Sequence, residues 1–148
     1  MQPSDDEPLA RVLVMTGKAI REDFEGSLTR AGSSLATWVV LNGIDRGRWE
    51  SQRELATDLR IEGATLTRHL DRMERDGLIA RTRDTADRRQ IRVELTKDGR
   101  ALHRSLRTTA QTVGARACEG LSEQEKTTLR RLLDRVRANV GGERADES

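Results

Sequence analysis

Residues 51–95 constrain the fold more than any other part of the chain, because they encode four short elements in close succession. Ser51 and Glu54 have the spacing of a capping box, which predicts a helix of about two turns over 52–59. After a short turn, the segment GATLTRHLDRMERDG predicts a second helix, and Gly77 provides the left-handed residue that ends it. The pattern is typical of a helix-turn-helix.

Two short strands are predicted immediately afterwards, over 78–83 and 90–95, and the second alternates strictly between apolar and polar residues. The connection between them contains Asp87, Arg88 and Arg89. A hairpin after a helix-turn-helix makes the unit a winged variant, and arginines at its tip would reach the flanking minor groove, where the negative potential of DNA is enhanced. We expect Asp87 to hold Arg89 in position.

The helix before the hairpin has two different faces when its residues are placed at about 100° intervals. One face is an apolar stripe, made of Leu66, Leu70 and Met73. The other carries groups that hydrogen-bond bases and phosphates, and its members are Thr65, Arg68 and Arg72. Because the second helix of such a motif lies in the major groove, we expect the DNA contacts there. Thr67 and His69 complete the candidates, with His69 at the boundary of the core. Arg75 is expected to be solvated or paired with Glu74.

Long amphipathic helices are predicted on both sides of this region. An apolar stripe runs along residues 9–30, a linking helix follows over 34–44, and a third helix begins at Thr96 and continues to about 119. Ser122 and Glu125 form a second capping box, which opens a final helix rich in leucine and valine.

The predicted fold is mainly α with a small β-hairpin wing, that is, a winged helix-turn-helix with N- and C-terminal dimerisation helices. We assign residues 34–96 to the DNA-binding region, and 9–31 together with 97–140 to a helical dimerisation region. A single copy would leave the leucine stripes of those helices in water, so we expect a homodimer. The polar ends, 1–8 and 141–148, are expected to be flexible.

Composition limits the partners and the chemistry. Charged residues make up 35% of the 148-residue chain, and there are 27 Lys and Arg residues against 25 Asp and Glu. With a pI of about 9.2, this favours an anionic partner. The winged helix-turn-helix predicts that this partner is double-stranded DNA. The single cysteine, Cys118, allows no internal disulfide, and His69 and His103 do not have the spacing of metal ligands. His103 is expected to be partly buried without a special partner. The first residues do not resemble a signal peptide, and no apolar run approaches membrane-spanning length, so a cytoplasmic protein is expected.

No catalytic motif is found, neither a glycine-rich phosphate loop nor a nucleophile elbow, so we expect no enzyme and no cofactor. Two other functions remain as alternatives. A non-specific nucleoid-type binder would carry a larger basic excess, and a helical protein-interaction module would carry arginines only for solubility. A gel shift with and without competing duplex separates the three.

The chain resembles the MarR family of bacterial transcriptional regulators, especially its SlyA-like branch. The resemblance is carried by RELATDLRIEGATLTRHLDRMERDGLIART and DRRQIRVELTKDG, and most specifically by Asp87 and Arg89 of the wing and by Leu95, Thr96 and Gly99 after it. It implies that Arg89 enters the minor groove with Asp87 bracing it, and that Arg68 and Arg72 lie in the recognition helix. Arg88 is the remaining basic residue of the wing and is included among the candidate DNA-binding residues.

The resemblance also implies an effector. Family members often bind small phenolic or carboxylate compounds in a crevice between the dimer helices and the DNA-binding region, and release DNA in response. We therefore expect a repressor on an inverted-repeat operator, relieved by such a ligand, although activation is equally compatible with the sequence. Trp38 lies where SlyA-like members line that crevice. A core tryptophan is the competing interpretation.

Overall fold

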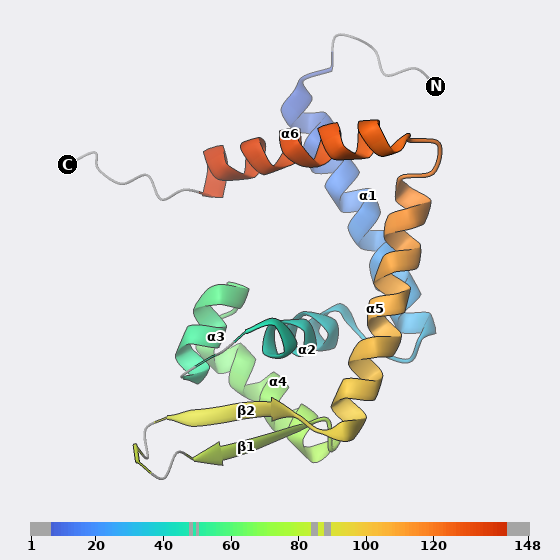
Figure 1. The fold of residues 1–148 in the computed structure, drawn as a ribbon. Helices are drawn as coiled ribbons and strands as arrows, with labels where there is room; N and C mark the ends of the chain where they lie inside the picture. Colours follow the sequence, from blue (N-terminus) through green and yellow to red (C-terminus); the bar gives the residue numbers. More distant parts are fainter. Residues whose placement is uncertain (1–6, 48, 50, 84–85, 88–89, 142–148) are drawn as a thin grey trace, which may run out of the picture. The chain divides into compact units, whose positions relative to one another are not determined.

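The computed structural model describes residues 7–47, 49, 51–83, 86–87 and 90–141. Its elements follow the predicted order (Figure 1), and they are α1 Leu9–Arg30, α2 Leu35–Arg46, α3 Gln52–Leu59, α4 Gly63–Arg75, β1 Ile79–Arg83, β2 Ile91–Leu95, α5 Lys97–Ala117 and α6 Glu123–Gly141. The chain forms two compact units, Met1–Val113 and Gly114–Ser148. Most residues of the two ends predicted to be flexible lie outside the described part.

Serine side chains start three of the helices. Ser34 Oγ accepts a hydrogen bond from the backbone N–H of Thr37 at 3.2 Å, and Ser51 Oγ accepts one from that of Glu54 at 3.1 Å. At α6 the capping box is complete, because Ser122 Oγ accepts from Glu125 N while the Glu125 carboxylate accepts from Ser122 N. These bonds satisfy backbone N–H groups that have no partner within the helix. The predicted starts of α3 and α6 are confirmed.

The core of the first unit is built by helices α1 to α5 and strand β1. Its fully buried large side chains are Leu28, Val40, Leu41, Leu55, Leu66, Leu70 and Leu106. Figure 1 shows the hairpin alongside α4, and α2 and α3 also pack against that helix. The apolar stripe of α4 is therefore buried by its neighbours, which leaves its opposite face available for a partner.

The hairpin is antiparallel, with Ile79 opposite Leu95 and Arg81 opposite Val93. A compact junction joins it to α5. Thr96 Oγ1 donates to the carbonyl of Gly77 at 2.6 Å and accepts from the N–H of Gly99 at 3.0 Å, so this one hydroxyl both caps α5 and ties it to the end of α4. A Cβ at Gly99 would lie 1.9 Å from the carbonyl oxygen of Leu78, which only glycine avoids.

The second unit has a different character. Within α6 no residue is buried, and Leu129, Leu132, Leu133 and Val136 are each between 37% and 44% exposed. Its apolar stripe is therefore partly exposed to water along the whole helix. Within the part of the chain that the structure describes, none of the helices is both long enough and apolar enough to cross a membrane.

Candidate DNA interface

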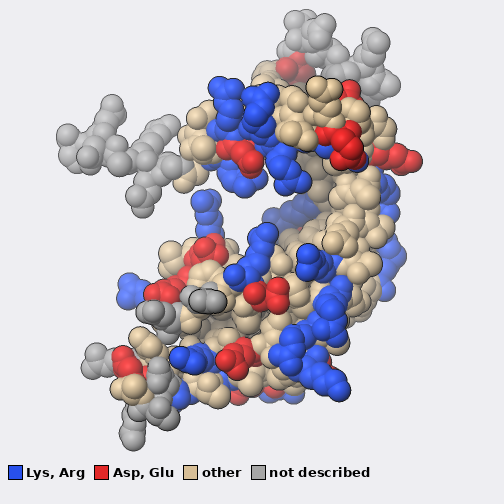
Figure 2. Space-filling model, in the orientation of Figure 1, with Lys and Arg blue, Asp and Glu red and all other residues tan. Residues whose placement is uncertain are grey.

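Helix α4 presents the predicted arginine face. Leu66 and Leu70 are fully buried on one side, whereas Arg68 and Arg72 are exposed on the other. Arg68 Nη2 donates to Thr65 Oγ1 at 3.3 Å, one turn earlier on the helix. The structure thus places these residues together, and within the described part of the chain the Thr65 hydroxyl takes one of the five guanidinium donors of Arg68. Basic and acidic side chains are interleaved over the face of the molecule that Figure 2 draws.

His69 lies at the edge of this face and is half-buried. Its pKa is lowered from the ordinary value, chiefly because burial disfavours the charged ring and further because Arg72 and Arg68 are positively charged neighbours. The ring is therefore neutral near pH 7, and it offers one donor and one acceptor but no charge. Its predicted position at the boundary of the core agrees with this placement.

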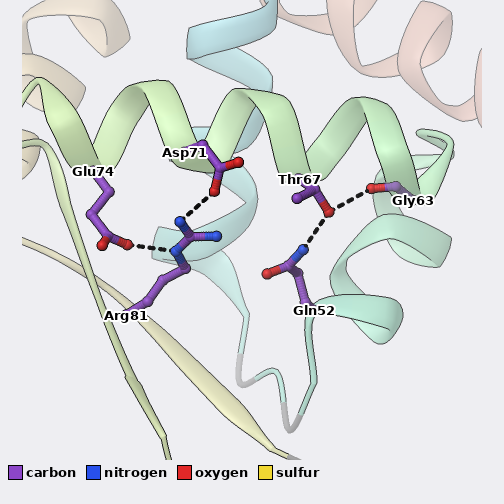
Figure 3. A network of polar contacts seen from close by, with 6 residues as sticks. All are labelled: Gln52, Gly63, Thr67, Asp71, Glu74 and Arg81. Carbon is purple, nitrogen blue, oxygen red and sulfur yellow. Dashed lines mark hydrogen bonds and ion pairs between the residues drawn. The ribbon is translucent and has the colours of Figure 1, made fainter.

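Thr67 faces the preceding helix. Its hydroxyl donates to the carbonyl of Gly63 at 3.0 Å and accepts from Nε2 of Gln52 at 2.8 Å, as Figure 3 shows. Gln52 is the first residue of α3, so this chain of bonds joins the two helices of the helix-turn-helix at one end. The hydroxyl proton of Thr67 is already used within the protein. The main role of this residue is therefore to join α4 to α3.

A second polar network lies further along the same helix. Arg81 of β1 reaches α4, where its Nη2 donates to Asp71 Oδ1 and its Nε donates to Glu74 Oε2 (Figure 3). The hydrogen bond that Arg81 donates to Glu74 is the main cause that raises the pKa of Arg81. Burial lowers that pKa, and the hydrogen bond donated to Asp71 raises it further. Arg75 was expected to be solvated or paired with Glu74, and it is exposed. Glu74 binds Arg81 instead, because the strand brings that arginine against the helix.

Part of the predicted wing lies outside the described residues. Arg88 and Arg89 belong to that part, so their predicted minor-groove contacts remain predictions. Asp87 is described and exposed, and its backbone carbonyl accepts from the N–H of Gln90 at 3.0 Å, immediately before β2. The strands that support the connection are those predicted from the sequence.

Trp38 takes part in an aromatic cluster. It stacks on His103 with ring centroids 5.5 Å apart and an angle of 13°, and it meets the edge of Phe24 at 6.1 Å. His103 is 5% exposed, with Nε2 3.4 Å from Asn42 Oδ1. The expectation that His103 has no special partner is therefore wrong, because its ring covers one face of the indole. A hollow of about 460 Å³ opens beside the cluster, lined by Trp38, Asn42, Asp45, Arg46, His103, Arg107, Ala110 and Gln111.

Comparison with known proteins assigns this arrangement to a family. The MarR family model matches residues 34–91, the segment that contains α2 to α4 and β1 and ends at the first residue of β2. The crystal structure of transcriptional regulator PA3341 is 32% identical, with a TM-score of 0.76 over 90% of this chain and 98% of that one. The chain belongs to the MarR family.

Two further MarR-family proteins are similar along nearly their whole length. A cysteine-to-serine mutant of MarR from Escherichia coli, crystallised with operator DNA, is 27% identical with a TM-score of 0.75 over 87% of this chain and 93% of that one. The HTH-type transcriptional repressor Rv2887 of Mycobacterium tuberculosis is 25% identical over 90% of this chain and 96% of its own. Its crystal structure with salicylic acid has a TM-score of 0.71, covering 89% of this chain and 98% of that one.

The sequence predicted the arginines of the recognition helix α4, but it did not predict the contact of Arg81 with Asp71 and Glu74 that joins this helix to β1. Nothing in the order of residues linked Arg81 to Asp71 and Glu74, since the contact depends on how β1 crosses α4. One available signal was the alternation of β1, which places an arginine on the same face as the buried Ile79. A charged residue at such a position requires a partner.

Proposed function

We propose that the protein is a sequence-specific DNA-binding transcriptional repressor that binds an inverted-repeat operator as a homodimer. Helix α4 enters the major groove, where Arg68 and Arg72 contact bases or phosphates, and the hairpin reaches the minor groove through Arg89 braced by Asp87. The likeness of residues 53–82 and 87–99 to SlyA-like members supports placing it in that branch of the family. Repression is relieved by a small phenolic or carboxylate ligand.

One observation carries this proposal: α4 buries one complete apolar face and exposes an arginine face beside an antiparallel hairpin. Helix-turn-helix proteins read DNA with the early residues of their second helix, and arginine makes the commonest specific base contact, a bidentate one to guanine. The similarity to the MarR mutant crystallised with operator DNA extends over most of the chain.

The exposed apolar stripes support a homodimer. In α1, Leu9, Val14 and Ile20 are between 44% and 70% exposed, and the leucines of α6 are also exposed. Association of two copies would remove this surface from water, which is the main favourable term in protein assembly. Two recognition helices in a symmetric dimer would meet half-sites about one duplex turn apart, roughly 34 Å.

Enrichment of a random duplex library by the full-length protein tests the DNA-binding proposal. An inverted repeat should be recovered, and a gel shift should show that an excess of scrambled duplex does not displace it. Smearing that disappears at modest salt would support a non-specific binder instead, and no retention would support an interaction module.

The effector is proposed to bind beside Trp38. The hollow there combines an aromatic wall with Arg46 and Arg107, whose guanidinium groups can pair with a carboxylate. One face of the indole is covered by His103, so a ligand ring would contact its edge or its other face. Salicylic acid, which is bound in the structure of Rv2887, is the appropriate probe.

Fluorescence of Trp38 tests this site. The only other tryptophan is Trp49, so a Trp49→Phe variant isolates the signal of Trp38. Salicylate should quench that emission saturably and release the selected duplex over the same concentration range. Arg107→Ala should weaken both effects together. Release of DNA without a change in Trp38 emission would place the ligand elsewhere.

A further inference from the structure

We propose that Arg81 is a positioning residue for DNA recognition, which fixes the wing strand β1 against the recognition helix α4. Arg81 thereby fixes the position of the hairpin relative to α4, so that α4 can contact bases while the hairpin contacts the minor groove. The inference rests on the proposed DNA-binding function and assigns a role to three residues, Asp71, Glu74 and Arg81, that are not themselves placed on DNA.

The position of Arg81 in the strand is the first observation. Side chains alternate across β1, so Arg81 shares a face with Ile79, which is 2% exposed and belongs to the core. The Arg81 side chain itself is only 20% exposed. Withdrawing a guanidinium from water is unfavourable unless charged acceptors replace the water. An apolar side chain would pack there without that cost, so the arginine serves a purpose other than burial.

The geometry of its partners is the second observation. Nη2 bonds Asp71 and Nε bonds Glu74, and these acids lie three residues apart, on neighbouring turns of one helix face (Figure 3). Two bonds from one rigid, planar fork to two points on α4 restrict both the distance and the rotation of β1 relative to that helix. Lysine, a point charge on a flexible stem, cannot fix both.

The third observation is that the network places two negatively charged side chains close to the proposed DNA-binding face. Asp71 and Glu74 stand on the same helix as Arg68 and Arg72, the residues proposed to approach DNA. Each carboxylate near a phosphate backbone weakens attraction to DNA. Arg81 neutralises only one of the two negative charges, so electrostatics alone would favour removing both acids. Their contribution must therefore lie in positioning.

This gives two effects of opposite sign, which one variant separates. In Asp71→Ala/Glu74→Ala, electrostatics predicts tighter binding to every duplex, whereas loss of positioning predicts weaker binding to the specific duplex only. We expect the affinity for a scrambled duplex to rise slightly. The ratio of specific to scrambled affinity should fall by about tenfold or more, as for one lost base contact in each half-site.

Two further variants complete the design, with affinities measured on the duplex enriched by the wild-type protein and on its scrambled counterpart. Asp58→Ala/Glu62→Ala removes two exposed acids of the same helix-turn-helix and should raise both affinities while keeping the ratio. Arg81→Lys keeps the net charge but offers no fork, and its ratio should lie between wild type and the double alanine. Thermal unfolding verifies that each variant is folded.

The outcomes are separable from those of the proposed function. If the wild-type protein enriches no sequence, the DNA-binding proposal fails. If it enriches one and the Asp71→Ala/Glu74→Ala variant keeps the wild-type ratio, only the positioning role of Arg81 is wrong. An equal fall in the ratio for the Asp58→Ala/Glu62→Ala control would also overturn it, because the effect would then follow charge rather than the network.

Discussion

Helices α4 and α6 are both amphipathic and rich in arginine, yet they differ in what their apolar stripes contact. In α4, Leu66 and Leu70 are fully buried, while in α6 Leu132 is 44% exposed and no residue is buried. The apolar residues of α4 complete the core of their own unit, which leaves its arginines as the free surface. Those of α6 are themselves the free surface. Under the proposed function, a similar sequence pattern would serve DNA recognition in one helix and association in the other.

Disrupting the apolar stripe of α6 should have the largest effect. In Leu132→Glu, a charge would have to be buried wherever that stripe is covered, so the proposed dimer should dissociate and operator affinity should fall by more than about a hundredfold. Sedimentation velocity at micromolar concentration measures the first, and a gel shift measures the second. Asn139→Glu, an exposed change in the same helix, is the control. Unchanged sedimentation of Leu132→Glu would mean that α6 does not mediate association.

The contrast between packed and open surfaces also occurs within α5, where two glycines provide a matched pair. A Cβ at Gly99 would meet the Leu78 carbonyl, whereas one at Gly114 meets nothing within 4 Å. Gly99→Ala should destabilise the protein by about 3 kcal/mol through forced displacement of backbone. Gly114→Ala should stabilise α5 by about 0.5–1 kcal/mol, because alanine has the higher helix propensity. Denaturant unfolding measures the free energy of unfolding of both variants. Equal changes in the two would contradict the close approach at Gly99.

Local sequence signals were sufficient for the elements and for the two faces of α4. Serine caps and the apolar period act within a few residues, so α3 was predicted with the bounds that the structure has, and β1 and β2 each begin one residue later than predicted. The contacts of Arg81 and His103 could not be predicted in this way, because each joins segments that are distant in the chain. Their partners depend on how a strand crosses a helix and on how α5 packs against α2. Trp38 illustrates both points, since its place on α2 was predicted and its stacking on His103 was not.

Arginines of the two helices should also differ in their effect on DNA. Arg68→Ala should cost about 2 kcal/mol on the selected duplex if Arg68 makes a bidentate base contact, and preference at one base pair in each half-site should relax. Arg131→Ala, in α6, is the matched control and should leave that preference unchanged. Binding is measured on specific and scrambled duplexes across a salt series. An equal loss on both duplexes, with a salt slope reduced by about two for the dimer, would show that Arg68 contacts only phosphates.

The smallest effect concerns His69 and pH. Its pKa is lowered in the folded protein, by burial first and then by Arg72 and Arg68, so the unfolded chain binds a proton more readily. Its contribution to stability is therefore complete above the ordinary value near 6.5 and is lost as pH falls through the lowered folded pKa. Over the same range the protonated ring adds positive charge beside the arginine face, so affinity for any duplex should rise as stability declines.

His69→Gln should remove both trends and leave binding at pH 7.5 within about twofold of wild type, because a neutral ring adds no charge there. Thermal unfolding and fluorescence anisotropy between pH 5 and 7.5 would measure them, and a variant that keeps the wild-type pH dependence would assign the titration to another group.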